Sequence, residues 1–223
     1  MIPKNNLPIL AQDLVRIHRA ITRGLTVAVT EGTRFIREGF PDPNIQQGFA
    51  DYIQSLAAVL GAHHLSEDEI LFPALKEKLP EAPYMRLSDD HQFIETSLDI
   101  VRKLIGDLKS GSHKVGLGIV IEGFKRDTTI WTPHIRMEEA YFSQDAIASV
   151  MTPEEQAQIT ISMATHSREQ AGPPYLVLPF VLFNLSLVDR AAMAQTLPKE
   201  VTEEFIPKIW KENWAPMKPF LLE

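Results

Sequence analysis

The chain has 223 residues, of which 44% are hydrophobic, so it is long enough and apolar enough to bury a sizeable core. It carries 22 Lys and Arg against 29 Asp and Glu, a net charge of -7, and its basic residues are scattered, which disfavours nucleic acid as a partner. The absence of cysteine excludes disulfides, thiolate metal sites and a cysteine nucleophile, so any metal must be held by nitrogen and oxygen.

Four long helices are predicted in the first two thirds of the chain. Apolar residues recur at helical spacing, as in the stripe from Leu7 to Leu25, and no alternating segment is long enough to indicate a strand. Breaks rich in Pro, Gly or polar residues separate the helices, which are expected at residues 5–38, 44–78, 83–109 and 115–148. Because short connections favour antiparallel neighbours, we predict an all-α fold, an up-down-up-down four-helix bundle over residues 1–148.

Residues 149–223 are predicted to add C-terminal helices that pack on the bundle. Thr152 can cap a helix that starts with Pro153 and has an acidic first turn. The helices are expected at residues 153–170, 174–186 and 198–213. The segment 175–185, YLVLPFVLFNL, is apolar on nearly every side and must be buried. Packing against the bundle would bury it, and so would the seam of a homodimer.

This apolar segment is too short to span a bilayer, and it contains Pro179. The N-terminal residues also lack a long apolar stretch after a basic start, so no targeting segment is expected. We therefore expect no membrane partner and place the chain in the cytoplasm.

The histidines follow a pattern that repeats in the two halves of the bundle. A histidine on the first helix is followed, on the second, by a histidine and a glutamate four residues apart, and the third and fourth helices repeat this order. The lone and paired histidines are separated by 45 residues in the first half and by 43 in the second, which brings them to a similar level along the bundle axis. The candidate site residues are His18, His63, Glu67, His91, His134 and Glu138.

A buried group of imidazoles and carboxylates needs a partner, because a buried charge without one costs many kcal/mol, and a divalent or trivalent cation supplies that partner. Two carboxylates can bridge two ions while two histidines bind each ion. This arrangement leaves room for a bridging oxide or hydroxide and for an open coordination position. Imidazole with carboxylate suits iron, and also manganese or zinc, so the donor types do not choose between these metals.

The segments that carry these residues resemble the hemerythrin-like, or HHE cation-binding, domain family. Beside His18, the resemblance rests on HHLSEDEILFPAL, DDHQFIE and HIRMEEAYF, so each long helix contributes its expected element in order over about residues 5–148. Members of the family are four-helix bundles around a di-iron centre. The resemblance implies a cofactor of two iron ions, with the paired ligands His63, Glu67, His134 and Glu138 and the single ligands His18 and His91.

One position departs from the oxygen-carrying hemerythrins, whose third helix supplies two histidines four residues apart. Here Glu95 stands four residues after His91 and occupies the second of these positions. A centre with fewer imidazoles favours redox chemistry, sensing or storage over reversible oxygen release. Glu95 is a candidate seventh ligand.

The other histidines are expected outside the ligand set. His64 points about 100° away from its neighbouring ligand around the helix, so we expect it beside the site or exposed. Asp68 is expected to be a hydrogen-bond acceptor near the site or a solvated charge. His113 lies in a loop rich in Gly and Ser and is expected to be exposed, and His166 is expected to make a surface or tertiary contact.

Three functions are compatible with the sequence. The first is a hemerythrin-like non-heme di-iron protein whose open position interacts with oxygen, peroxide or nitric oxide. The second is a non-catalytic metal or oxygen sensor or an iron-handling module, in which metal binding orders the helices and the C-terminal residues report that order. The third is a metal-free helical interaction domain.

Overall fold

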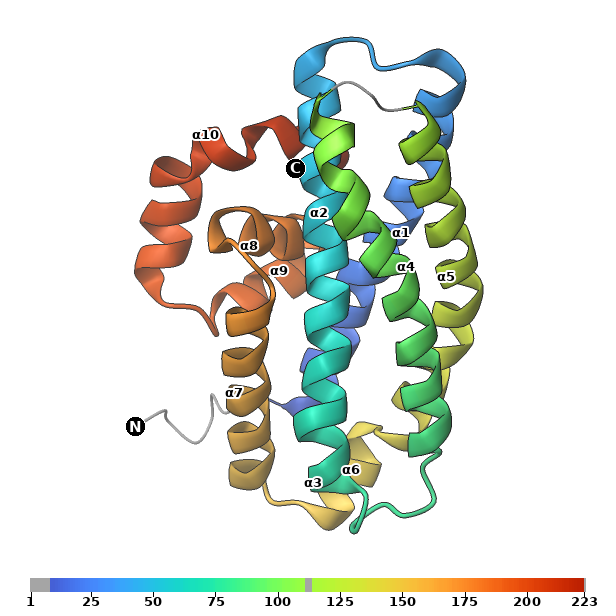
Figure 1. The fold of residues 1–223 in the computed structure, drawn as a ribbon. Helices are drawn as coiled ribbons and strands as arrows, with labels where there is room; N and C mark the ends of the chain where they lie inside the picture. Colours follow the sequence, from blue (N-terminus) through green and yellow to red (C-terminus); the bar gives the residue numbers. More distant parts are fainter. Residues whose placement is uncertain (1–8, 111–113, 223) are drawn as a thin grey trace.

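The computed structural model describes residues 9–110 and 114–222, and within these ranges the regular structure is helical, with no strand (Figure 1). Four long helices stand side by side: α1 (Leu10–Glu38), α2 (Pro43–Ser66), α4 (Tyr84–Ser110) and α5 (Lys114–Tyr141). Consecutive members run in opposite directions, and α1 and α4 each pack against both α2 and α5. The predicted all-α class is confirmed.

Local sequence signals set the turn between the first two helices. α1 ends where Gly39 adopts a φ of 82°, a left-handed conformation that favours glycine, and donates its N–H to the carbonyl of Phe35. α2 begins at Pro43, which lacks the N–H that would be unpaired at this position. Asp42 caps the helix by accepting a hydrogen bond from the N–H of Ile45. The reversal is therefore short, and the two helices lie antiparallel.

The second predicted helix, residues 44–78, is interrupted. After α2 the chain makes a π-helical turn, Glu67–Leu71, closed by an N–H that donates to the carbonyl five residues earlier, and then the short helix α3 (Phe72–Leu75). Pro73 provides the physical reason, because it has no N–H to donate to the preceding turn and its ring pushes the carbonyl there aside.

The fourth predicted helix, residues 115–148, is too long. α5 ends at Tyr141, and a separate helix, α6 (Gln144–Val150), follows it. Ser143 explains the new start, because its side chain accepts a hydrogen bond from the N–H of Ala146. Helix α6 therefore spans the predicted domain boundary at residue 148.

The C-terminal helices agree with the prediction at the start and depart from it later. α7 (Pro153–Gln170) has the predicted bounds, and Thr152 forms a reciprocal capping box with Glu155. α8 (Pro174–Phe183) is shorter than predicted because Ser186 caps a further helix that the prediction missed. The remaining elements are α9 (Leu187–Ala194), a π-helical segment (Val201–Ile209), α10 (Lys211–Trp214) and a 3-10 helix (Ala215–Phe220).

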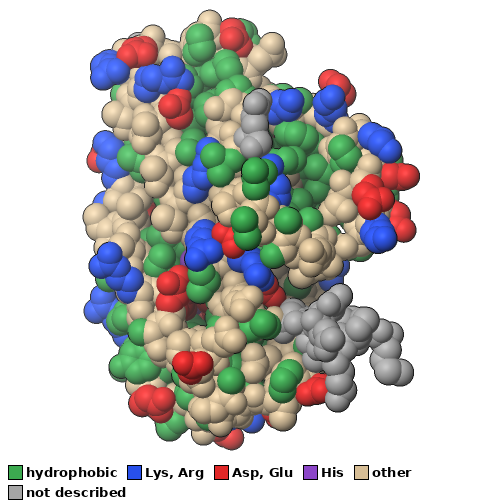
Figure 2. Space-filling view, turned by 180° about the vertical axis from the view of Figure 1, so that it is seen from behind, with side chains coloured by type: hydrophobic (Ala, Val, Ile, Leu, Met, Phe, Trp, Pro, Cys, Tyr) green, Lys and Arg blue, Asp and Glu red, His purple; other side chains and the backbone are tan. Residues whose placement is uncertain are grey.

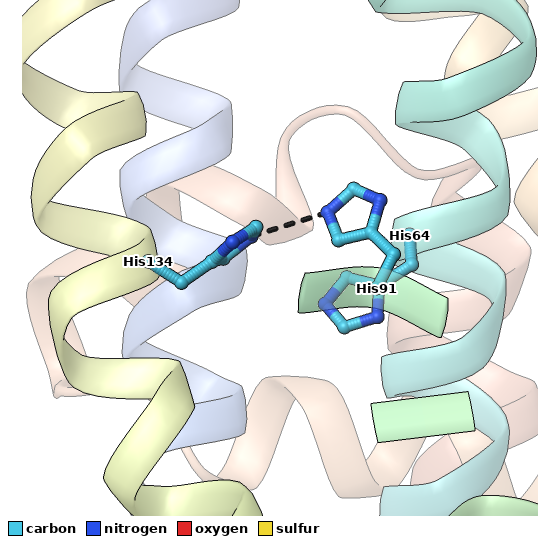
Figure 3. A group of neighbouring side chains, drawn as sticks. All are labelled: His64, His91 and His134. Carbon is cyan, nitrogen blue, oxygen red and sulfur yellow. Dashed lines mark hydrogen bonds between the residues drawn. The ribbon is translucent and has the colours of Figure 1, made fainter. Parts of the chain in front are cut away.

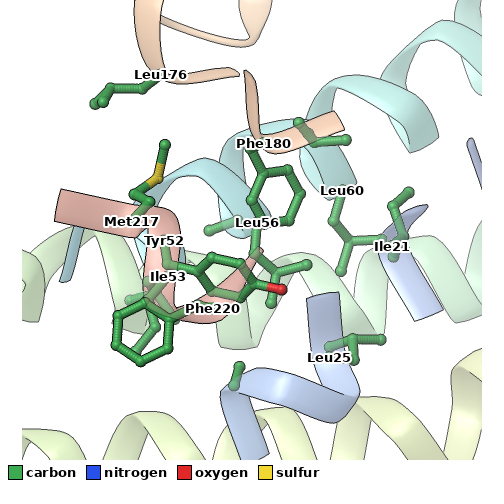
Figure 4. Close-up of a cluster of buried hydrophobic side chains, with 14 of the residues drawn as sticks. Ile21, Leu25, Tyr52, Ile53, Leu56, Leu60, Leu176, Phe180, Met217 and Phe220 are labelled. Carbon is green, nitrogen blue, oxygen red and sulfur yellow. The ribbon is translucent and has the colours of Figure 1, made fainter. Parts of the chain in front are cut away.

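The apolar segment around α8 is buried within the chain. α8 packs against α1 and α2, and the Phe180 ring lies edge-on to the Tyr52 ring of α2, with 4.9 Å between centroids (Figure 4). Met217 and Phe220 of the 3-10 helix are also buried, and their element packs on α2. Packing within one chain accounts for this apolar surface. The homodimer stays a separate prediction, which the mass in solution tests.

A polar network fastens the C-terminal helices to the bundle. Arg23 of α1 donates to the side-chain oxygen of Asn184 and, over 2.8 Å, to the carbonyl of Phe220. The Tyr52 hydroxyl donates to the same Asn184 oxygen at 2.8 Å. Because Asn184 is buried, these bonds satisfy groups that would otherwise be costly to remove from water.

Gly48 of α2 marks a very close approach between the bundle and the C-terminal 3-10 helix. A Cβ at this position would stand 1.9 Å from the carbonyl oxygen of Pro216. We expect Gly48→Ala to displace that helix and to lower the free energy of unfolding by about 1–3 kcal/mol, the usual cost of overpacking. Urea denaturation at fixed pH measures the change.

Gly106 of α4 provides the matched control for this substitution. A Cβ there meets nothing within 4 Å, so Gly106→Ala is expected to raise the free energy of unfolding by about 0.5–1 kcal/mol through helix propensity alone. If both alanines stabilised the protein equally, the packing of Pro216 on Gly48 would be refuted.

Asp127 is a fully buried carboxyl group on α5. Burial raises its pKa from 3.8 to about 7, against smaller opposite effects from Ser97 and Arg126. Since the folded state keeps the proton that the unfolded state loses, this group destabilises the protein increasingly as the pH rises from about 4 to about 7. We expect Asp127→Asn to be nearly neutral at pH 4 and stabilising at pH 8, by an amount on the order of 4 kcal/mol. Urea titrations of both proteins at the two pH values test this, and a constant difference would contradict it.

The outer surface carries mixed charge. On the face shown in Figure 2, Lys and Arg side chains alternate with Asp and Glu, and neither sign covers a broad area. Within the described ranges, no helix has the length and apolar character that crossing a membrane requires.

The buried apolar side chains form two clusters with a polar layer between them. The larger cluster includes Ile21, Leu60 and Trp131, and the smaller one includes Leu14 and Phe142. On α1, His18 lies between Leu14 and Ile21 in the sequence, and the other long helices repeat this order of apolar, polar and apolar residues. The polar layer is therefore shielded from water on both sides along the bundle axis.

Candidate metal centre

All six predicted site residues lie in this polar layer. Each of the four long helices contributes one histidine, and the carboxylates come from the first residue of the π-helical turn and from α5. None of the six side chains is more than 4% exposed. The residues that the structure brings together are His18, His63, Glu67, His91, His134 and Glu138.

The six residues form two overlapping groups of four. His18 and His63 make up one group with the two glutamates, and His91 and His134 make up the other with the same two glutamates. Within each group, one nitrogen or oxygen atom from every residue lies within 4.8 Å of the others. Glu67 and Glu138 thus belong to both groups.

Glu67 spans the two groups with its two oxygens. Its Oε1 is 3.4 Å from Nε2 of His63, and its Oε2 is 3.5 Å from Nε2 of His91. The π-helical turn begins at this residue, so the widened backbone lies next to the side chain that joins the two groups. Such turns frequently occur at functional sites.

Glu138 also reaches both groups. Its Oε2 is 3.2 Å from Nε2 of His18 and 3.4 Å from Nε2 of His134, and its Oε1 is 4.0 Å from Nε2 of His91. The Nε2 atoms of His91 and His134 are 3.1 Å apart. Two nitrogens bound to one ion at about 2.1 Å and at right angles would stand at about this separation.

Several donor atoms in the cluster are buried without a hydrogen-bond partner. They include both carboxylate oxygens of Glu67 and of Glu138, and Nε2 of His18 and of His63. Unpaired buried charges are costly, whereas a cation at this point would pair with all of these atoms at once. The donor set of imidazole nitrogen and carboxylate oxygen, without sulfur, therefore fits a metal ion.

Carboxylates outside the cluster orient two of the imidazoles. Nδ1 of His18 is 3.0 Å from a carboxylate oxygen of Glu139, and Nδ1 of His91 is 3.0 Å from a carboxylate oxygen of Asp68. The other oxygen of Asp68 accepts from the Ser88 hydroxyl at 2.6 Å. A proton on Nδ1 leaves the lone pair on Nε2, which faces the cluster, so these contacts favour the tautomer that binds metal.

The outer nitrogen of His134 also faces a carboxylate, but at a longer distance. Its Nδ1 is 3.6 Å from a carboxylate oxygen of Asp90, and Arg86 donates to the other oxygen of that carboxylate at 3.1 Å. Asp90 and Glu139 were not among the predicted site residues, although each directly adjoins one of them. Only the fold reveals that these neighbours reach the outer nitrogen of a histidine on another helix.

Burial and neighbouring charges set the protonation of the α2 residues. Burial, reinforced by the nearby histidines, lowers the pKa of His63 and of His64 well below the usual value. Both imidazoles are therefore neutral at pH 7, which is the form that binds a cation. Burial also raises the pKa of Glu67 well above its usual value, and the charge of Glu138 adds to this effect.

The α1 and α5 residues stabilise each other's charged forms. Burial alone would raise the pKa of Glu138, but the close contacts with the imidazoles of His134 and His18 outweigh it and lower that pKa. Burial would likewise lower the pKa of His18, but Glu138 and Glu139 outweigh it and raise that pKa. The protein groups alone thus keep one glutamate of the cluster ionised.

The other candidates fall outside the six-residue cluster. Glu95 is 45% exposed and pairs with Arg102, so the structure does not bring it to the cluster. Nε2 of His166 donates a hydrogen bond to a carboxylate oxygen of Glu69 at 2.8 Å, which is a tertiary contact of the kind predicted. His113 lies outside the described residues. His64 is buried rather than exposed, and its ring stacks on that of His91.

Two cavities approach the cluster from different sides. One of about 930 Å³ lies beside α2 and α4 and is lined by His64, Asp68 and His91 as well as by apolar side chains. The other, of about 420 Å³, is lined by His18 and Glu138 and by residues of α1 and α5. A small molecule could therefore reach the buried layer without unfolding the bundle.

Comparisons with known proteins agree with this geometry. The family model described as the hemerythrin HHE cation-binding domain matches residues 10–145, more than half of the chain. No curated protein and no solved structure matches the chain. The matched segment runs from the first residue of α1 into α6 and includes all six residues of the cluster. The chain therefore belongs to the hemerythrin HHE cation-binding domain family.

Proposed function

We propose that this protein holds a non-heme di-iron centre that interacts with oxygen, peroxide or nitric oxide. The single observation that supports it best is the sharing of Glu67 and Glu138 by two otherwise separate donor groups. Two carboxylates that each reach two pairs of imidazoles suit a pair of cations close together. Iron is the proposed metal, and manganese and zinc, which accept the same donors, are the alternatives.

The proposed ligands divide evenly between the ions. His18 and His63 would hold one ion, and His91 and His134 would hold the other, with Glu67 and Glu138 common to both. When bound, a pair of irons supplies redox chemistry and a Lewis-acidic position for a small ligand. The chain's own contribution is to orient the imidazoles and to limit access by water.

Aromatic side chains shield the proposed centre from water. The Trp131 ring lies edge-on to the His18 ring, with 5.6 Å between centroids, and donates its indole N–H to Thr22 at 2.8 Å. On the other side, the Phe72 ring stacks on the His91 ring at 5.6 Å. These contacts restrict the rotamers of the imidazoles and exclude bulk water from the layer.

Metal analysis tests the proposal directly. Protein purified without added metal should contain close to two irons per chain, and oxidised protein should show near-ultraviolet charge-transfer bands. Exposure to oxygen, peroxide or nitric oxide should change these bands. A preparation that binds no iron under any of these conditions would refute the di-iron assignment.

A sensor or iron-handling role is the second candidate, and one contact favours it. α7 packs against α2 and against the π-helical turn, where the hydrogen bond between His166 and Glu69 joins them. A movement of Glu67 could therefore be transmitted through this contact to the C-terminal helices. Turnover of the small molecule would support an enzyme, whereas a change only in oligomeric state or in protease sensitivity would support the sensor.

A further inference from the structure

The larger of the two cavities, about 930 Å³ in volume, lies beside α2, between α4 and the turn that joins α7 to α8. A water-sized molecule takes up only about 30 Å³, so a diatomic ligand would leave most of this space unfilled. The lining residues on α2 run from Gln54 to Asp68, a length of about 20 Å along a helix, and the walls are mainly apolar. Cavities of this size bind organic molecules, and the length of this one suits an elongated molecule.

Small residues of α2 form the floor of this cavity. Ala58 and Gly61 line it, and a Cβ added at Gly61 would stand 2.8 Å from the guanidinium of Arg102, which reaches across from α4. Arg102 is bound there by Glu95 and, at 2.8 Å, by Asp99. The charges at this rim therefore neutralise one another, which favours a ligand without a charge of its own.

The end of the cavity nearest the cluster contains an imidazole without a partner. His64 lines the cavity and is 4% exposed, and among the described residues neither of its ring nitrogens has a hydrogen-bond partner. Its ring stacks on that of His91, with 4.0 Å between centroids and 13° between planes (Figure 3). A phenyl ring would stack equally well, whereas an imidazole carries at least one N–H, which is costly to leave unpaired in the interior.

The groups beside His64 favour one kind of hydrogen-bond acceptor. The Asp68 carboxylate lines the same end of the cavity and contacts Nδ1 of His91 and the Ser88 hydroxyl. Asp68 would repel a carboxylate of the ligand, and an ammonium group has no acceptor to offer the N–H of His64. A hydroxyl or carbonyl oxygen avoids both difficulties.

We propose that this cavity binds a neutral, mainly aliphatic molecule whose hydroxyl or carbonyl oxygen accepts a hydrogen bond from His64. His91 lines the same end of the cavity, so the oxygen of the ligand lies beside the candidate metal centre and its chain extends along α2 toward Gln54. The inference deepens the proposed function by naming an organic ligand for the same centre. It rests on that function in this one respect, since binding itself needs no metal.

Calorimetric titration of the metal-free protein with straight-chain primary alcohols tests the proposal. From butanol through hexanol to octanol, the affinity should rise about 4-fold for each added methylene group, as burial of that group in an apolar cavity requires. Octanoate and octylamine should bind at least about 10-fold more weakly than octanol, because each carries a charged group into the interior without a partner. Affinity that does not depend on chain length, or equal affinity for octanoate, would overturn the proposal.

Two variants locate the binding site. Ala58→Trp fills the middle of the cavity from a partly buried position and should prevent octanol binding, whereas Ala164→Trp, at an exposed position of α7, is the matched control and should bind it normally. His64→Phe keeps a stacked ring but removes both nitrogens, so octanol should bind roughly 3–10-fold more weakly, the usual value of one hydrogen bond. Circular dichroism checks that each variant is folded. Unchanged octanol affinity in Ala58→Trp would place the alcohol elsewhere and refute the site.

A measurement on the wild type covers the case in which a variant fails to fold. In metal-free protein labelled with nitrogen-15 at histidine, octanol should shift the ring signals of His64 and leave those of His166, which contacts Glu69 outside the cavity, unchanged. Unshifted His64 signals in the presence of bound octanol would overturn the role of this residue. Protein that binds alcohols but no metal would refute the proposed function alone, and protein that binds metal but no alcohol would refute this inference alone.

Discussion

Glu67→Gln is expected to weaken the binding of both metal ions, although it replaces a single atom. The two carboxylate oxygens of Glu67 lie 3.4 Å from Nε2 of His63 and 3.5 Å from Nε2 of His91, so each proposed ion loses a negatively charged donor. We expect the affinity for each ion to fall by at least about 100-fold, more than for loss of a group that only orients a ligand. The effect is measured as the metal content of the protein after incubation with a chelator and gel filtration.

Two comparisons sharpen this prediction. His63→Gln should weaken one ion and leave the other largely unchanged, because His63 belongs to only one of the two donor groups. Glu95→Gln is the matched control for charge, since that carboxylate pairs with Arg102 away from the cluster, and it should retain two ions. Full metal content in Glu67→Gln would show that this residue does not bridge the centre.

Removal of the metal is expected to destabilise the whole bundle. With free metal a thousandfold above the dissociation constant, each ion stabilises the folded state by about 4 kcal/mol, or about 8 kcal/mol for two. For a chain of this length, the midpoint of thermal unfolding should then fall by about 15–30 °C after chelation. Calorimetry of the metal-loaded and chelator-treated protein measures the difference.

The same measurement on a double variant, Glu67→Gln with Glu138→Gln, provides the control. This variant lacks both shared carboxylates, so chelator should no longer change its unfolding temperature. The comparison is made within each variant, metal-loaded against metal-free, because Glu138→Gln also removes the charge partner of His18 and His134. A wild type whose midpoint is insensitive to chelator would count against a structural role for the metal.

The convergence of the six residues could be predicted from the sequence because it depends on residue spacings within helices and on a repeat along the chain. Four residues separate His63 from Glu67 and His134 from Glu138, and a helix places such residues on one face. The repeat in the two halves, together with short turns, then brought the faces to one level. The start of α7 was predicted from an equally local signal, because Thr152 is a capping residue followed by proline.

The features that the sequence did not predict depend on contacts between helices. Asp90 and Glu139 are adjacent in sequence to site residues, but only the packed bundle decides which imidazole each of them reaches. His64 was expected beside the site or exposed because a helical wheel turns it away from His63. The structure shows the first alternative: the His64 ring packs against His91 of α4 and against Trp131 and His134 of α5 and is buried, which the sequence of α2 alone could not decide.

The π-helical turn after α2 also keeps successive side chains of this segment facing the interior of the bundle, from the polar layer onward. In a regular α-helix, every step of four residues advances about 40° around the axis, so Leu75 would lie about 120° away from His63. The wide turn accommodates one extra residue, so the side chains after it point about 100° further back around the axis than they would in a regular helix. As a result, His63, Glu67, Leu71 and Leu75 are all buried. Deleting Ile70 would remove the extra residue of this turn. The side chains of α3, which close that end of the bundle, would then rotate toward water while His63 stayed in place.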